Sequence, residues 1–90
     1  MTPDWHGDAE LLIYRDNARL PVVLDLYRKP AKPGLHDRWA GTFAAERLHV
    51  LTPGRGVVYL PDGSEAEVMV EGFDVLTGKG DFIGLAGAPF

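Results

Sequence analysis

The fold is decided by the stretch Gly56-Val57-Val58-Tyr59-Leu60-Pro61-Asp62-Gly63-Ser64-Glu65-Ala66-Glu67-Val68-Met69-Val70-Glu71. Two apolar runs flank a turn of proline, aspartate, glycine and serine, which is the pattern of a β-hairpin. Ala66, Val68 and Val70 alternate with acidic residues along the second run. A shift of one residue would bury three carboxylates, so we expect these three residues to face inward and Glu65, Glu67 and Glu71 to face water.

A second hairpin is predicted nearer the N-terminus. From Asp8 to Arg15, every second residue is apolar and would lie on one face of a strand, while the residues between them would lie on the opposite face. The same period of two returns from Leu20 to Arg28. Between these strands, Asp16-Asn17 supplies residues that tolerate left-handed turn conformations. We expect one face of this hairpin to carry the core residues Ala9, Leu11, Ile13, Leu20, Val22, Leu24 and Leu26.

The remaining segments suggest further short strands. Residues 29–34 contain two prolines and a glycine and are expected to form an exposed connection. Residues 39–51 fit a strand, with a short helical turn near residues 44–48 as the alternative. A last strand is expected over residues 81–87.

These elements predict one all-β domain over residues 1–90. The expected architecture is a small antiparallel barrel of six to seven strands, with a two-layer sandwich as the alternative. A repeated motif supports the barrel: Trp5-x-Gly7, Trp39-x-Gly41 and Phe82-x-Gly84 each place a ring two residues before a glycine. In this interpretation the ring fills the interior while the glycine, like Gly87 further on, allows the strand to bend.

Composition narrows the classes of function. The chain has no cysteine, which excludes disulfides, thiolate metal sites and a cysteine nucleophile and fits a cytoplasmic setting. Its formal net charge of −4 lies in the second half, and Arg28, Lys29, Lys32 and Arg38 form only a modest basic cluster, so nucleic-acid binding is not expected. The apolar runs are too short for a membrane span, and we expect no membrane partner.

Several features taken in order resemble a known family. They are Trp5-x-Gly7-x-Ala9, Pro33-Gly34 running into Trp39-x-Gly41, Gly54-Arg55, Asp62-Gly63, and Gly84-x-x-Gly87-x-Pro89-Phe90. Together they resemble a small actinobacterial all-β domain of unknown function, which occurs alone or fused to proteins similar to flavin-dependent monooxygenases. The resemblance spans almost the whole chain and implies an accessory or binding role. It carries no catalytic residue over to this sequence.

The residues suited to catalysis or metal binding are few. His36, Asp37, Glu46 and His49 are the nearest approach to a metal or acid–base set, but a metal site needs three or more converging ligands. The single serine, Ser64, belongs to a turn and lies outside any Gly-x-Ser-x-Gly elbow. We therefore expect no metal, no cofactor and no assigned catalytic residue.

Asp25 lies between two leucines on the second face of the first hairpin. It could act as an acid or base, although an arginine such as Arg15 is the more expected cross-strand partner. An enzyme using Asp25, His36 or His49 is the least favoured of the functions considered.

The same second face supplies the leading functional hypothesis. Leu12, Tyr14, Val23 and Tyr27 point away from the expected core and would form an exposed apolar patch. Such a patch predicts a non-enzymatic interaction module that forms a homodimer or binds another protein, unless the tail or part of residues 39–51 covers it.

Two alternatives stay open. One is a small barrel that binds an apolar ligand in a pocket formed by Trp5, Tyr14, Trp39 and Phe82. The other is an accessory subunit of a flavin-dependent oxidoreductase, as the resemblance implies.

Overall fold

The computed structural model describes residues 2–29, 38–45 and 53–90. These ranges contain β-strands and no helix. The strands are β1 (Trp5–Ile13), β2 (Ala18–Lys29), β3 (Arg38–Ala45), β4 (Gly54–Tyr59), β5 (Glu65–Asp74) and β6 (Lys79–Gly84).

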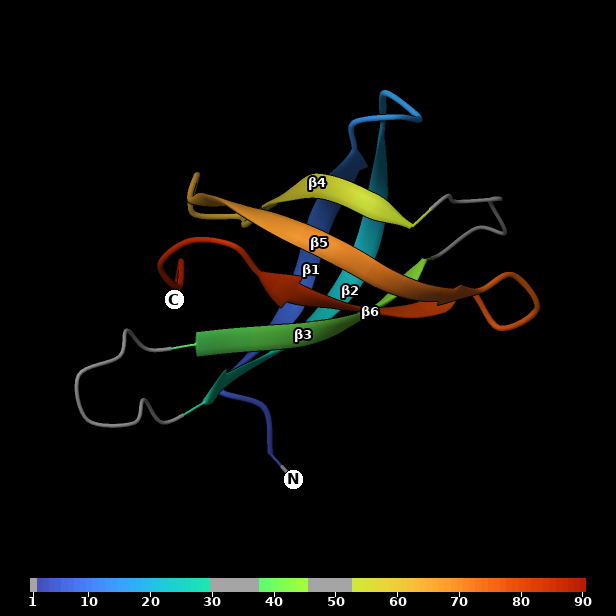
Figure 1. Ribbon diagram of the computed structural model, residues 1–90. Coiled ribbons are helices and arrows are strands. Elements are labelled where there is room, and N and C mark those ends of the chain that lie inside the picture. Colours follow the sequence, from blue (N-terminus) through green and yellow to red (C-terminus); the bar gives the residue numbers. More distant parts are fainter. Residues whose placement is uncertain (1, 30–37, 46–52) are drawn as a thin grey trace.

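The six strands form a closed antiparallel barrel in the order β1-β2-β3-β6-β5-β4. It consists of two three-stranded meanders, β1-β2-β3 and β4-β5-β6, which are joined where β3 pairs with β6 and β1 pairs with β4. Figure 1 shows the long β1–β2 ribbon crossing behind β4 and β5. The barrel prediction is confirmed with six strands rather than seven, and the sandwich alternative is not. Ala44 and Ala45 end β3, while the rest of the proposed helical turn lies outside the described residues.

The hairpin over residues 56–71 has the predicted register. Ala66, Val68 and Val70 are buried, whereas the three glutamates are exposed. In the turn, the Leu60 N–H donates to the Ser64 carbonyl (2.8 Å), and the Asp62 carboxylate accepts from the Ser64 N–H (2.8 Å). Gly63 has a φ of 93°, a conformation that favours glycine. The turn residues and the alternating pattern therefore specify the same register for this hairpin.

The first hairpin also follows its sequence pattern. β1 and β2 pair from Trp5–Leu26 to Ile13–Ala18, and Asn17 adopts the left-handed turn conformation with a φ of 48°. Ala9 is partly buried and packs against the core. The other six residues predicted to face inward are all buried: Leu11, Ile13, Leu20, Val22, Leu24 and Leu26.

The inner face of β3 and β6 alternates aromatic residues with glycines. Phe43 pairs with Gly80 and Gly41 pairs with Phe82, and the same register brings Trp39 opposite Gly84. A Cβ atom added at Gly84 would lie 2.1 Å from the Trp39 Nε1 atom, and one added at Gly80 would lie 2.4 Å from the Phe43 Cζ atom. Each glycine therefore provides the space that the opposite ring occupies.

This arrangement explains two of the three aromatic–glycine motifs. Trp39 and Phe82 fill the interior as predicted, with ring centroids 6.0 Å apart in an edge-to-face contact. Their glycines do more than allow bending, because each accommodates a ring from the neighbouring strand. Gly7 differs, since the ring of Trp5 on the same strand lies over it. Gly87 lies beyond β6 in the tail, so it is not a corner of the barrel.

The C-terminal tail closes one end of the barrel. The Trp39 indole N–H donates to the Ala86 carbonyl (2.7 Å), and the Phe90 ring lies 6.0 Å from the Trp39 ring. The Arg28 guanidinium lies 5.1 Å from the Phe90 ring centroid and also donates to the Phe90 carbonyl. The tail is thus held by a core residue and by a residue near the end of β2.

We expect Gly84→Ala to destabilise the domain by about 1–3 kcal/mol, because the new methyl group would overlap the Trp39 indole. Chemical unfolding followed by tryptophan fluorescence measures the change. Gly87→Ala is the matched control, since a Cβ atom there meets nothing within 4 Å and stability should stay within about 0.5 kcal/mol of wild type. Equal destabilisation by both substitutions would contradict the packing argument.

The Asp62 turn gives a pH prediction. The hydrogen bond from the Ser64 main chain, with a smaller contribution from the Ser64 side chain, lowers the pKa of Asp62 below its ordinary value of 3.8. The stabilisation from the ionised carboxylate is therefore present above pH 3.8 and is lost as the pH falls through the lower folded-state pKa. Asp62→Asn should have a lower melting temperature than wild type at pH 7, and this difference in melting temperature, the gap, should disappear in strong acid. Thermal melts from pH 7 to pH 2 measure this gap, and a constant gap would refute the assignment.

Candidate interaction surface

The outer face of β3 forms the floor of a groove. Its outward residues, Ala40, Thr42 and Ala44, are small, and β2 and β6 flank them on either side. The cross-strand pairs Val23–Ala44, Asp25–Thr42 and Tyr27–Ala40 define the β2 wall. The pairs Ala44–Lys79, Thr42–Asp81 and Ala40–Ile83 define the β6 wall.

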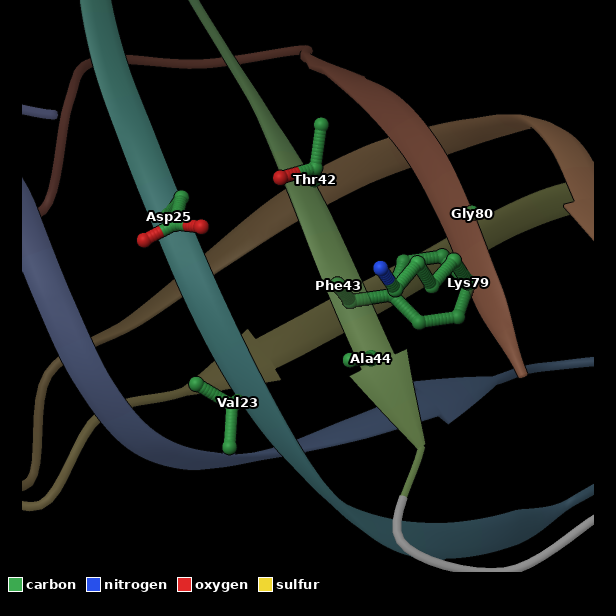
Figure 2. Close-up of a pocket in the computed structure, with 7 residues that line it drawn as sticks. All are labelled: Val23, Asp25, Thr42, Phe43, Ala44, Lys79 and Gly80. Atoms are coloured by element: carbon green, nitrogen blue, oxygen red, sulfur yellow. The ribbon is translucent and has the colours of Figure 1, made fainter. Parts of the chain in front are cut away.

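One half of the groove is a hollow of about 370 Å³ lined by Val23, Asp25, Thr42, Phe43, Ala44, Lys79 and Gly80. Figure 2 shows Asp25 and Thr42 on adjacent strands, and the side chain of Lys79, from β6, overlaps the Phe43 ring in this view. In this hollow, Asp25 on the β2 wall and Lys79 on the β6 wall carry opposite charges, and Thr42 on the floor between them carries a hydroxyl group.

The other half of the groove is more apolar. Tyr27, Ala40, Ile83 and Met69 are direct cross-strand neighbours on β2, β3, β6 and β5. We call these four residues the apolar row. Ile83 is 37% exposed, and Tyr27, Ala40 and Met69 are half-buried. Beside the row lies a hollow of about 530 Å³, which Tyr27, Ala40 and Ile83 help to line.

Charges beside the apolar row are sorted by strand. On the β2–β3 side the row is followed by Lys29 and Arg38, which pair across the two strands. On the β5–β6 side the exposed charged neighbours are acidic: Glu67, Glu71 and Asp81. The exposed charges are therefore basic on the β2–β3 side and acidic on the β5–β6 side, while the half-buried Asp25, two residues before Tyr27 on β2, contacts His6.

Asp25 has a different partner from the one expected. Its carboxylate contacts the His6 Nδ1 atom across β1 and β2, so the arginine pairing predicted from the sequence is wrong. The His6 side chain is 61% exposed and that of Asp25 is 35% exposed. The pair lies beside the groove, where the carboxylate orients the imidazole ring.

Most of the residues considered for metal binding or acid–base chemistry lie outside the described part of the chain. Within residues 2–29, 38–45 and 53–90, no three histidine, aspartate or glutamate side chains are grouped to hold a metal ion. Ser64 lies in the exposed hairpin turn and donates its main-chain N–H to Asp62. His36, Asp37, Glu46 and His49 lie outside the described residues.

The predicted interface residues fall into two groups. Val23 and Tyr27 stand on the β2 wall of the groove, four residues apart on one side of the strand. Leu12 instead pairs with Arg19 on β2 and with Val57 on β4, and Tyr14 follows the end of β1 and is 48% exposed. Leu12 and Tyr14 thus lie at the seam between β1 and β4, on the opposite side of β2 from β3 and the groove. Of the four residues, the structure brings only Val23 and Tyr27 to the groove.

The predicted pocket residues are likewise separated. Trp39 and Phe82 pack against each other in the core, and Trp5 is partly buried against the same core. Tyr14 lies beyond the opposite end of β1 from Trp5. The interior near the two buried rings is occupied by side chains, as expected for a barrel of this size.

Sequence reasoning missed three members of the apolar row: Ala40, Ile83 and Met69. Each has the outward parity of its strand, so alternation alone would have placed it on the surface. What brings them together is the pairing of β3 with β6 and of β6 with β5, and residues 40, 69 and 83 carry no local signal of that pairing.

Comparisons with protein-family models, with curated proteins and with solved structures give no match to this chain. A search of the described residues finds no helix with the length and apolar character needed to cross a membrane.

Proposed function

We propose that this domain is a non-enzymatic interaction module that forms a homodimer through the apolar row on the outer face of β2, β3, β6 and β5. The observation that carries the proposal is the row itself: four cross-strand neighbours with an exposed isoleucine between half-buried residues. Apolar side chains on neighbouring strands form a continuous surface, and such surfaces in small domains are usually covered by a partner.

The sorted charges favour a second copy as that partner. A two-fold axis through the middle of the row would place the basic end of one copy, Lys29 and Arg38, against the acidic end of the other. In such an interface every contact occurs twice, and the same surface serves both subunits. The opposite charges also fix the relative orientation of the two copies.

The domain could also serve as an accessory subunit. The resemblance to a domain fused to proteins similar to flavin-dependent monooxygenases suggests an enzyme of that class as the protein that the dimer assists. The ligand-binding alternative has less support, because its proposed residues do not share one cavity.

The first test is the mass of the domain in solution. Light scattering should give the mass of a dimer for wild type, and Ile83→Arg should give a monomer, because it introduces a charge in the middle of the row. Val75→Arg is the matched control: Val75 is 46% exposed in a loop away from the row, so this variant should remain a dimer. A wild type that is monomeric at millimolar concentration would refute the homodimer.

A charge-reversal experiment tests the orientation. Lys29→Glu with Arg38→Glu gives an acidic variant, and Glu67→Lys with Glu71→Lys gives a basic variant. Each should be monomeric alone, since like charges then face each other across the axis, and an equimolar mixture should form heterodimers. Analytical ultracentrifugation of the three samples measures this. Dimers of either variant alone would refute the two-fold arrangement of charges.

A further inference from the structure

The barrel is closed unevenly along the seam between β1 and β4. This ladder pairs only residues Glu10–Ile13 of β1 with residues Gly56–Tyr59 of β4. β1 nevertheless begins at Trp5 and pairs with β2 along its whole length. Residues 5–9 therefore have a paired strand on one side only among the described residues.

The direction of the main-chain groups follows from one hydrogen bond. The Tyr14 N–H donates to the Arg55 carbonyl of β4 (3.1 Å) and continues the β1–β4 register. Main-chain groups alternate between the two edges of a strand, so those of Leu12, Glu10, Asp8 and His6 face the same side as Tyr14. Leu12 and Glu10 pair with β4, while Asp8 and His6 lie beyond the end of the ladder.

Pro61 explains why the ladder stops. Continuing the register would place Pro61 opposite Asp8. Proline has no N–H to donate, and residues 61–63 turn the chain into β5. The Leu60 main chain is already committed to this turn through its bonds with Ser64 and Gly63. The same turn that forms the β4–β5 hairpin thus leaves the edge of β1 at Asp8 without a paired strand in residues 2–29, 38–45 and 53–90.

There is space beside this edge. A hollow of about 590 Å³ is bounded by Asp8, Ala9 and Glu10 on β1 and by residues 59–61, 63 and 65 of the hairpin, with Arg19 at its side. Its lining includes the acidic residues Asp8, Glu10 and Glu65, of which Glu10 is paired with Arg19. Arg19 is already engaged, because it pairs with Glu10 and its guanidinium lies 4.0 Å from the Tyr59 ring centroid. Ala9 and Leu60 provide an apolar inner side.

We propose that the free edge of β1 at His6 and Asp8 binds an extended segment of a partner protein in which basic and apolar residues alternate. The evenly spaced N–H and C=O groups of one strand edge are best satisfied by another strand, which adds to the sheet. Outward side chains of the added strand meet the acidic residues of this lining, so basic residues fit there. Inward side chains meet Ala9 and Leu60, so apolar residues fit there. This surface is separate from the apolar row.

Amide hydrogen exchange measured by NMR provides the first test. In the free domain, the Asp8 amide should exchange rapidly, whereas those of Gly7 and Ala9, which face β2, should be protected. Adding a capped Lys-Val-Lys-Val-Lys peptide should slow exchange at Asp8 by about tenfold or more and leave Ala9 unchanged. The same peptide with its three central amide nitrogens methylated should have no effect, and neither should Glu-Val-Glu-Val-Glu.

Two variants separate the hydrogen bonds from the charge. Asp8→Pro removes an N–H that has no strand partner in the described part of the chain, so the domain should fold and bind the peptide at least about tenfold more weakly. Asp8→Asn keeps the N–H and should weaken binding only a few-fold. Ala9→Pro is the folding control, because it removes a bond to β2 and should destabilise the barrel strongly.

Three results would overturn the proposal. One is an Asp8 amide already as protected in the free domain as that of Leu12, because the edge would then be covered by the chain itself. Another is an unchanged Asp8 exchange rate at millimolar peptide. The third is slowing that follows the concentration of the domain without peptide, which would assign the edge to a second copy. The exchange measurement on wild type decides the matter even if Asp8→Pro fails to fold.

Discussion

The barrel depends on the fit between rings and glycines across β3 and β6. Three aromatic side chains, Trp39, Phe43 and Phe82, each face a glycine on the neighbouring strand, so large rings share a narrow interior without overlap. A residue with a Cβ atom at these glycines would need the ring to move. The pairing also fixes the register of β3 on β6, because a shift of one residue would turn the rings outward. It thereby joins the two meanders of the fold.

The rings and glycines occupy only the inner face of β3 and β6, so the outward residues of these strands can form a groove. Ala40, Thr42 and Ala44 alternate with the inward residues of β3 and keep the floor of the groove low between β2 and β6. Alanine is depleted in strands and adds little to sheet stability. The two outward alanines of β3, Ala40 and Ala44, are therefore better explained by the shape of the outer surface than by the stability of the sheet. With rings filling the interior, the opportunities for recognition lie outside.

The sequence predicted the parts of this structure that depend on local patterning. Alternation placed Leu11, Leu24 and Val68 inside, and turn chemistry located both hairpins. It failed where non-local pairing decides the neighbours. Leu12 and Val23 share an outward parity, but the register of β1 on β2 separates them, whereas Ala40 and Ile83 become neighbours through the β3–β6 pairing. Asp25 illustrates the same point. The register of β1 on β2 places His6 opposite it, whereas its charge alone suggested an arginine partner.

The seam at β1 and β4 shows how a single turn residue can affect both folding and recognition. A closed barrel normally has no free strand edges, but Pro61 ends the closing ladder early and leaves a short edge at His6 and Asp8. Exposed edges promote non-specific pairing unless they are short or charged, and here the exposed Asp8 lies on the edge, with the exposed Glu10 just beyond it where the ladder to β4 begins. The same carboxylates that discourage pairing with a second acidic edge would attract a basic one. Protection against aggregation and selection of a partner can therefore arise from the same side chains.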